Sequence, residues 1–196
     1  DVGYDSMTSL AVEADHGSPL APVALHLRAK HQMHSTLATL PRKTKHLDQL
    51  APTMKAIDQI ELGRRPVHII DREADSLGHF RDWTAAGHLF LVRCDERRVC
   101  WQGKSVLLSE INATLDREFR FRRSGEARYR GKKMRREVAE VEVVLDRIHK
   151  TRVNGKQKEV RGAAITLRAV FVRLVDDQDY IVAEWMLLTN VPADQA

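Results

Sequence analysis

The fold of this protein is decided by residues 66–93, which read PVHIIDREADSLGHFRDWTAAGHLFLVR. Residues 67–70 and 89–92 are short apolar runs of the kind that form buried strands. Between them, apolar side chains recur at helical spacing, at Leu77, Phe80 and Trp83. Asp75 or Ser76 would cap this helix and Gly87 would end it. A strand, a helix and a strand with compact connections predict a parallel right-handed crossover, and therefore an α/β core.

The segments on either side of this stretch follow different patterns. Before it, residues 7–12 and 20–27 predict a hairpin. A helix follows, with its apolar face at Leu47, Leu50, Met54, Ile57 and Ile60 and its end at Gly63. From Asp95 on, the pattern indicates mainly strands, expected at residues 99–101, 104–106, 119–122, 138–143, 164–174 and 180–188. The turns are expected at Gln102-Gly103, Asn154-Gly155 and residues 176–179.

Length and composition exclude several classes of protein. The chain has 196 residues, of which 43% are hydrophobic and 30% charged, so it is long enough to bury a core and too apolar to be disordered. No apolar run approaches the roughly 18–20 residues of a membrane span, and residues 1–4 do not resemble a signal peptide. The first residue is Asp1 rather than Met, so we expect a piece of a longer protein. Cys94 and Cys100 are expected to be reduced thiols of a cytoplasmic protein.

The positive charge of the chain is concentrated between residues 117 and 136. Two glutamates, Glu118 and Glu126, stand there against ten cations: Arg117, Arg120, Arg122, Arg123, Arg128, Arg130, Lys132, Lys133, Arg135 and Arg136. This basic tract carries a net charge of +8, so with a total of +5 the remaining residues sum to −3. A single basic patch is what a contact with a phosphate backbone requires, although a solvated hairpin with incidental charge has the same composition.

Three acids follow the first buried strand of residues 66–93. Asp71 lies directly at its carboxyl end, where open α/β sheets bind their ligands, and carboxylates there could hold a divalent cation. The alternative is that they are acids at a helix N-terminus, which the helix dipole favours. We favour this alternative for Glu73 and Asp75, and a functional role for Asp71. One carboxylate cannot make a two-metal site, which needs several bridging ligands.

Together these segments resemble the DDE transposases of bacterial insertion sequences, in the insertion-sequence-four group (Tn-five-like). Residues 71–75 are similar to the block of the second catalytic aspartate, and residues 184–192, EWMLLTNVP, to a tryptophan block near the end of the catalytic core. Phe90-Leu91-Val92-Arg93 and residues 119–144 lie at matching distances, so the resemblance spans nearly the whole chain.

The resemblance implies an α/β fold with an incomplete ribonuclease-H-like core and a large mainly-β insertion. The core would be residues 1–94, the basic β-rich insertion residues 95–190, and residues 191–196 the start of the connection to a C-terminal core helix. The family's first aspartate and final glutamate would lie outside this chain, so we expect it to be inactive alone.

The resemblance also implies roles for single residues. Asp71 would be a catalytic ligand of Mg²⁺ or Mn²⁺, and Arg72 and Arg93 would contact DNA phosphates. Trp185 would stack on a flipped base at the transposon end, although without the family it is as readily a core or rim aromatic. In the basic tract, the DNA contacts would be Arg122, Arg123, Arg128, Arg130, Lys132, Lys133, Arg135 and Arg136. The partners would be transposon ends, target DNA and a second copy of the protein, at the bacterial nucleoid.

Two other functions stay open, and several are unsupported. The chain could be a non-catalytic basic nucleic-acid-binding module, or another metal-dependent nuclease with a ribonuclease-H-like fold. His31, His34 and His46 have no suitably spaced partner and are expected to be surface imidazoles. No serine lies in a G-x-S-x-G context, and no glycine-rich loop suggests a nucleotide cofactor.

Overall fold

The computed structural model describes residues 5–29, 32–36, 46–60, 62–153, 156–160 and 162–193. The chain divides into two compact units, Asp1–Pro66 and Val67–Ala196. Its fold is mixed α/β, with more strand than helix. The expected boundary at residues 94/95 falls inside the second unit, between two strands of one sheet.

The first unit contains an antiparallel sheet of β1 (Asp5–Val12), β2 (Pro19–Ala29) and β3 (Gln32–Ser35). The predicted β1–β2 hairpin is confirmed, and Gly17 in its turn has a φ of +69°. The 3-10 helix η1 (His46–Gln49) leads into α1 (Leu50–Asp58), which ends before the predicted stop at Gly63. Thr53 on α1 makes a 2.9 Å hydrogen bond with His26 on β2, and both side chains are buried.

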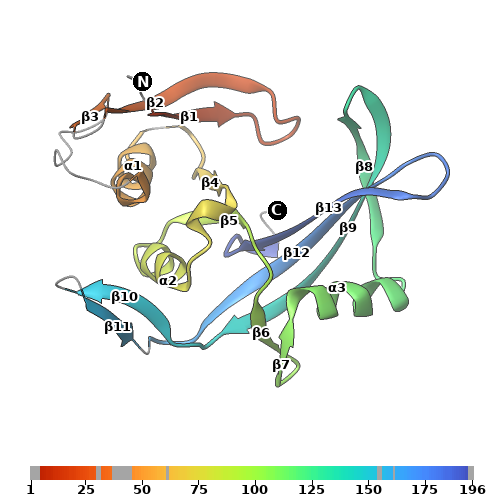
Figure 1. The fold of residues 1–196 in the computed structure, drawn as a ribbon. Coiled ribbons are helices and arrows are strands. Elements are labelled where there is room, and N and C mark those ends of the chain that lie inside the picture. The colour runs from red at the N-terminus through yellow and green to blue at the C-terminus, as the bar shows by residue number, and fades with distance from the viewer. Residues whose placement is uncertain are drawn as a thin grey trace. The chain divides into compact units, whose positions relative to one another are not determined.

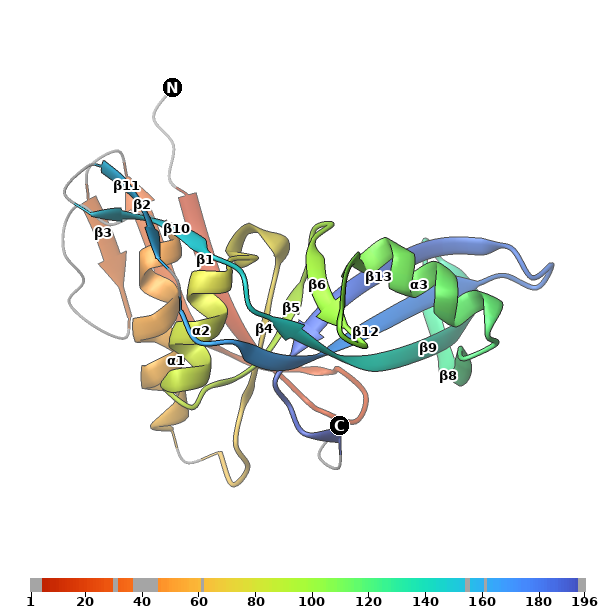
Figure 2. The same cartoon turned by 90° about the horizontal axis from the view of Figure 1, so that it is seen from below.

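The second unit is built on one eight-stranded sheet (Figures 1 and 2). Its strands are β4 (Val67–Ile70), β5 (Leu89–Arg93), β6 (Arg98–Trp101), β7 (Lys104–Leu107), β8 (Arg122–Tyr129), β9 (Lys132–Leu145), β12 (Ile165–Val175) and β13 (Ile181–Thr189). The order is β4-β5-β13-β12-β9-β6-β7, with β8 paired to β9. β4 and β5 are parallel, as predicted for a crossover, and the pairings from β5 onward are antiparallel. A separate hairpin consists of β10 (His149–Val153) and β11 (Lys156–Val160), and the turn expected at Asn154-Gly155 lies outside the described residues.

Two helices cover one face of this sheet. In α2 (Leu77–Ala85), which follows the short 3-10 helix η2 (Arg72–Ala74), Phe80 stacks on Phe90 of β5 with ring centroids 5.5 Å apart. In α3 (Leu108–Arg117), three fully buried residues face the sheet: Leu108, Ile111 and Leu115. Their burial, together with that of Phe80, Trp83 and Phe90, places the hydrophobic core between the helices and this covered face.

The other face of the sheet is the open face, defined by the alternation of side chains along each strand. Phe90 and Val92 of β5 point to the covered face, so Arg93 points to the open face. Arg93 is paired with Leu187 of β13, and Trp185 is two residues away on the same strand. Arg93, Leu187 and Trp185 therefore share the open face.

The strand predicted at residues 119–122 is wrong. Helix α3 occupies residues 108–117, Phe119 is 93% exposed with a φ of +54°, and β8 begins only at Arg122. Residues 119–121, in which Phe and Arg alternate, belong to the turn after helix α3 and form no strand. The remaining predicted strands and the turns at Gln102-Gly103 and residues 176–179 are confirmed.

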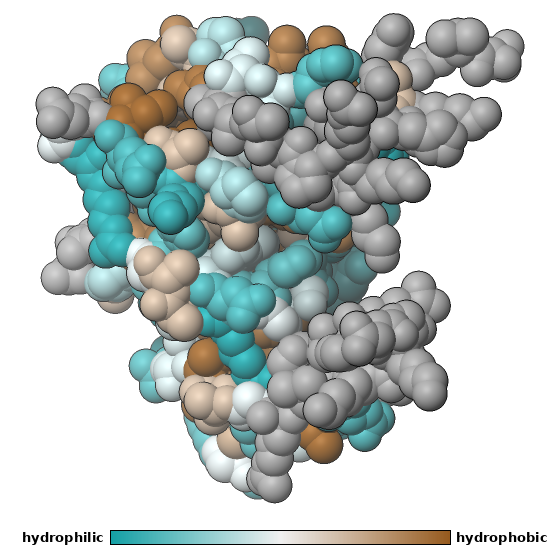
Figure 3. Space-filling model, turned by 90° about the vertical axis from the view of Figure 1, so that its left-hand side faces the viewer, coloured by the Kyte–Doolittle hydropathy of each residue, from teal (hydrophilic) through white to brown (hydrophobic). Residues whose placement is uncertain are grey.

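No helix of the described residues is long and apolar enough to cross a membrane. On the face of the molecule in Figure 3, the coloured residues form small hydrophilic and hydrophobic areas that alternate.

Candidate nucleic-acid interface

Asp71 lies where the sequence predicts it, immediately after β4 at the carboxyl end of the parallel pair. Its side chain is exposed, and Oδ1 accepts a 2.7 Å hydrogen bond from the backbone N–H of Arg72. This bond caps the 3-10 helix η2, so Asp71 has a structural contact as well as an accessible carboxylate.

Two arginines lie close to this carboxyl end. Arg93 Nη1 is 3.8 Å from Asp71 Oδ1, and Arg72 Nη1 is 3.7 Å from Asp95 Oδ1. All four side chains are between 46% and 68% exposed. Because ion pairs at such exposure contribute little stability, their guanidinium groups can exchange these carboxylates for phosphates at small cost.

Asp75 differs from Asp71 because its side chain is only 5% exposed. Its Oδ1 is 2.6 Å from Arg97 Nη2, and its Oδ2 accepts a 2.9 Å hydrogen bond from the backbone N–H of Asp95. Burial raises the pKa of Asp75, although the charge of Arg97 opposes that shift. The Arg97 guanidinium also lies 5.1 Å from the centre of the Phe80 ring. Asp75 therefore joins η2 to the segment after β5 and is not available to an outside ligand.

Side chains that follow Trp185 in the sequence form hydrogen bonds that join β13 to β5. The Thr189 hydroxyl donates to the carbonyl of Phe90 at 2.6 Å. The Asn190 amide accepts from the Phe90 N–H at 2.9 Å and donates to the carbonyl of His88 at 2.7 Å. These bonds fix the register in which Arg93 is opposite Leu187, and so keep Arg93 and Trp185 on one face.

Trp185 is half-buried, and its ring has an aromatic partner that the sequence did not predict. Tyr129, at the end of β8, contacts it edge to face, with centroids 6.1 Å apart and planes at 80°. Arg130, the next residue, has its guanidinium carbon 5.3 Å from the centre of the Tyr129 ring. The sequence offers only a weak signal for this contact, which is an aromatic residue directly before Arg130-Gly131. These two residues form the hairpin turn, with φ values of +49° and +79°.

The basic tract forms the β8–β9 hairpin and the end of helix α3, and many of its cations are already paired. The ion pairs are Arg120–Glu118, Arg122–Glu140, Arg123–Glu126, Lys133–Glu126, Arg135–Glu137 and Arg135–Asp179. The hydrogen bond from Lys133 lowers the pKa of Glu126, so this acid stays ionised between its two cations. Arg136 donates to the carbonyl of Ser124.

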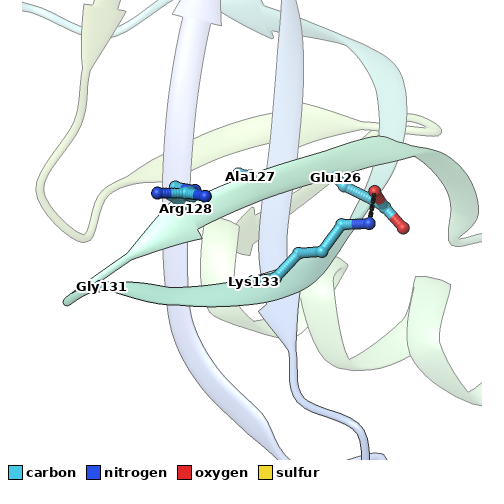
Figure 4. A pocket seen from close by; sticks show the side chains of 5 residues that line it. All are labelled: Glu126, Ala127, Arg128, Gly131 and Lys133. Atoms are coloured by element: carbon cyan, nitrogen blue, oxygen red, sulfur yellow. Dashed lines mark ion pairs between the residues drawn. The ribbon is translucent and has the colours of Figure 1, made fainter.

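Three cations without an ion pair among the described residues lie at the tip of the hairpin. Within the described part of the chain, Arg128, Arg130 and Lys132 make no ion pair. A pocket of about 410 Å³ lies along the hairpin, lined by Glu126, Ala127, Arg128, Gly131 and Lys133. Figure 4 shows the Lys133–Glu126 pair there, with Arg128 apart from it. The tip therefore presents free cations close to the Tyr129–Trp185 pair.

The chain supplies one ligand for a divalent cation at Asp71. Among the described residues, no group of three close ligating side chains includes Asp71, and Mg²⁺ binds through several oxygen ligands. The neighbouring Arg93 also opposes a second positive charge. These residues fit a single metal ligand and do not form a complete metal site.

The other candidates have no visible role in a site. His34 is exposed, His31 lies outside the described residues, and the side chain of His46 is not described. Cys94 and Cys100 are free thiols, and burial raises the pKa of Cys94.

No protein-family model and no curated protein sequence matches this chain.

Proposed function

We propose that this chain is a catalytic-core fragment of a transposase of the DDE type, in which Asp71 is one of the metal ligands. The observation that carries the proposal is that Arg93 and Trp185 share the open face, with Asp71 beside Arg93 and the unpaired cations near Trp185. Charge for a phosphate backbone and an aromatic surface for a base thus share one face of the sheet with Arg93, whose guanidinium lies beside the Asp71 carboxylate.

Each residue has a chemical task in this proposal. Arg72 and Arg93 bind phosphate oxygens near the bond to be cut, because a guanidinium offers two parallel N–H donors. Trp185 stacks on a base that has left the duplex. Asp71 holds Mg²⁺ or Mn²⁺ together with further carboxylates, and such a metal pair supplies an activated nucleophile and stabilises the leaving oxygen. We also predict that a second copy of the protein binds when two DNA ends are paired.

The second candidate is a non-catalytic nucleic-acid-binding module. It is favoured by the contacts of Asp71, which caps η2 and lies beside Arg93, since both are structural roles. A different metal-dependent nuclease of the ribonuclease-H-like type would use Asp71 in the same way as the first. All three bind nucleic acid, so DNA binding is tested first.

The experiment measures the affinity of the whole chain for a 30-base-pair duplex between 50 and 300 mM salt. We expect the logarithm of the affinity to fall linearly with that of the salt concentration. In Arg128→Gln/Lys132→Gln the slope becomes shallower by about 2, because each phosphate contact contributes about 1. The control is Lys55→Gln/Lys104→Gln, which removes two exposed cations elsewhere and leaves the slope unchanged. A chain without measurable duplex binding at 50 mM salt, or equal slopes for both variants, would overturn the proposal.

A further inference from the structure

Phe119, in the turn after helix α3, is the most exposed large hydrophobic side chain of the described residues, at 93%. Two backbone hydrogen bonds hold this turn. The N–H of Phe119 donates to the carbonyl of Asp116 at 3.0 Å. The N–H of Arg120 donates to the carbonyl of Leu115 at 2.9 Å. Such a pair of bonds ends many helices, and here it fixes the backbone from which the Phe119 ring projects.

The backbone at Phe119 has the conformation that favours glycine. Its φ is +54°, and the residue at this position of the turn is usually a glycine. A residue with a Cβ is strained there, and a ring that is almost wholly exposed gains no packing that would offset the strain. Phe121 shows the contrast, because it is half-buried and the guanidinium carbon of Arg173 lies 4.0 Å from its ring centre. A strained and exposed aromatic costs the fold stability, which indicates a contact outside the chain.

The cations beside Phe119 are Arg117 and Arg120, the two arginines of the basic tract that the proposed DNA contacts leave out. Arg117 donates to two oxygens of its own helix, and no ion pair of the described residues includes it. Arg120 Nη1 is 3.9 Å from Glu118 Oε2, and both side chains are more than half exposed. Both guanidinium groups can therefore turn to phosphates at small cost. Phe119, Arg117 and Arg120 together are the Phe119 surface.

The Phe119 surface lies on the other side of the sheet from Trp185. Val172 of β12 is opposite Trp185 on β13, so Arg173, the next residue, points to the covered face. Arg173 donates to Asp116 near the end of α3, which keeps this end of the helix and the turn after it at the covered face. The Phe119 surface is therefore distinct from the open face that the proposed function uses.

Duplex DNA matches the chemistry of the Phe119 surface. Proteins that bind the minor groove insert apolar side chains such as Phe between base pairs and bind beside them with arginines. DNA is favoured because Arg122 and Arg123 continue the row of cations from this turn into β8. An acidic protein with an apolar pocket is the alternative partner, and the two differ in whether base pairs part on binding.

We propose that Phe119 is a wedge that enters the minor groove of duplex DNA and parts two stacked base pairs, with Arg117 and Arg120 on the phosphates beside it. Such wedges kink a duplex by about 20–90°. Pyrimidine–purine steps part most easily, so the Phe119 surface selects flexible sites rather than base edges. This second contact goes beyond the proposed function and uses neither Asp71 nor Trp185.

The test uses a blunt 20-base-pair duplex with a central TA step, in which the adenine is replaced by 2-aminopurine. The fluorescence of this base rises when it loses a stacking neighbour, and the anisotropy of an end-labelled copy gives the Kd. We expect the fluorescence to rise when the whole chain binds. Phe119→Gly abolishes the rise and weakens the Kd by about tenfold, the contribution of one stacked contact. Phe119→Leu, which keeps an apolar wedge, retains the rise.

Thermal unfolding separates this role from a structural one. Phe119→Gly places the preferred residue at a positive φ, so its unfolding temperature equals that of the wild type or exceeds it by up to about 3 °C. The matched control is Gln102→Gly in the β6–β7 turn, where φ is +49° and the side chain is exposed. It relieves the same kind of strain and leaves the fluorescence rise and the Kd unchanged. Tyr180→Ala, at an aromatic side chain that is 67% exposed, also leaves both unchanged.

Three outcomes overturn the inference alone. A wild type that binds the duplex without a fluorescence rise leaves Phe119 to a protein partner and leaves the proposed function standing. A rise that persists in Phe119→Gly shows that another residue parts the base pairs. A lower unfolding temperature in Phe119→Gly shows that the ring supports the fold instead. No duplex binding at 50 mM salt overturns both the inference and the proposed function.

Discussion

Arg93 Nη1 lies 3.8 Å from Asp71 Oδ1, so the last residue of β5 faces the first residue after the neighbouring strand β4. Neither side chain is buried, so the pair contributes little to stability. Under the proposed function, the Arg93 guanidinium leaves this carboxylate for a DNA phosphate, and Asp71 is then available to hold a metal ion. In that proposal different atoms serve DNA binding and cleavage.

The variant Asp71→Asn tests that separation. The affinity for duplex DNA is expected to stay within about twofold, because an amide has nearly the same size and removes a charge that competes with phosphate. In a protein that carries the full set of carboxylates, we expect Mg²⁺-dependent strand cleavage to fall by about 10²-fold or more. Loss of a residue that hydrogen-bonds to a metal ligand already lowers activity by up to about 10²-fold, and loss of the ligand itself costs at least as much. The measurements are fluorescence anisotropy with labelled duplex and a gel assay of cleavage. Full cleavage by Asp71→Asn would show that Asp71 is not a metal ligand of the cleavage reaction.

Glu137 is expected to make stability depend on pH in the acid range. Burial raises the pKa of Glu137, but the hydrogen bonds from Arg135 at 2.7 Å and Arg173 at 2.8 Å outweigh burial, and the pKa lies below its usual value of 4.5. A lowered pKa gives stability that is present above pH 4.5 and is lost as the pH falls through the folded-state pKa. Glu137→Gln should therefore cost about 1–2 kcal/mol at pH 7 and much less at pH 3. Urea unfolding at both values measures this, and an equal cost at both would contradict the assignment.

The buried Asp75 carboxyl is expected to change the stability of the wild type with pH in the opposite sense. Burial raises the pKa of Asp75, so its contribution to stability is present below pH 3.8 and is lost as the pH rises through the folded-state pKa. Arg97→Met keeps an apolar contact with Phe80 but leaves the carboxylate without its cation, which costs about 3 kcal/mol at pH 7. The cost shrinks toward pH 4.5 as Asp75 takes up a proton. Arg97→Lys, the matched control, keeps most of the stability at both values.

Arg81 of α2 is expected to hold the β10–β11 hairpin. Its guanidinium donates to three carbonyls that flank this hairpin, those of Arg147, Gly162 and Ala163, at 2.8–3.2 Å. A Cβ at residue 162 would lie 2.8 Å from Arg81 Nε, so Gly162→Ala should disturb the same contact as Arg81→Lys. Both variants should speed amide exchange in β10 and β11 by about tenfold, if about 1.4 kcal/mol of local stability is lost. Exchange rates in β12 and β13 serve as the internal control, and a uniform change over the whole unit would argue against a local role.

Much of the second unit could be predicted because its local signals agree with one another. Residues 67–70 and 89–92 are short apolar runs bounded by polar or glycine residues, and a helix between them leaves few alternatives. Helix α3 was missed although Leu108, Ile111 and Leu115 have helical spacing, because the strand patterns on both sides dominated the interpretation. The alternation in residues 119–122 then suggested a strand where the chain only turns.

The candidate site was predictable in its residues and less so in its electrostatics. Net charge located the basic tract, but two acids just beyond it pair with its cations. Glu140 pairs with Arg122 across the β8–β9 pairing, and Glu137 pairs with Arg135 two residues away on β9. The Tyr129–Trp185 contact depends on a bulge that bends a hairpin over a neighbouring strand, which is a tertiary effect. The identification of Asp71, Arg93 and Trp185 as DNA-processing residues stays a prediction.

The pairing of β5 with two different partners sets an order of assembly. β4 and the Phe80–Phe90 stack come from a segment of fewer than thirty residues, whereas residues 91–93 pair with residues 187–189. Closing the long loop costs more chain entropy, so the local crossover forms sooner. During synthesis Asp71 and Arg93 can meet well before Trp185 leaves the ribosome. Under the proposed function, a nascent chain therefore acquires the phosphate-binding edge at Asp71 and Arg93 first, and β13 adds the Trp185 ring later.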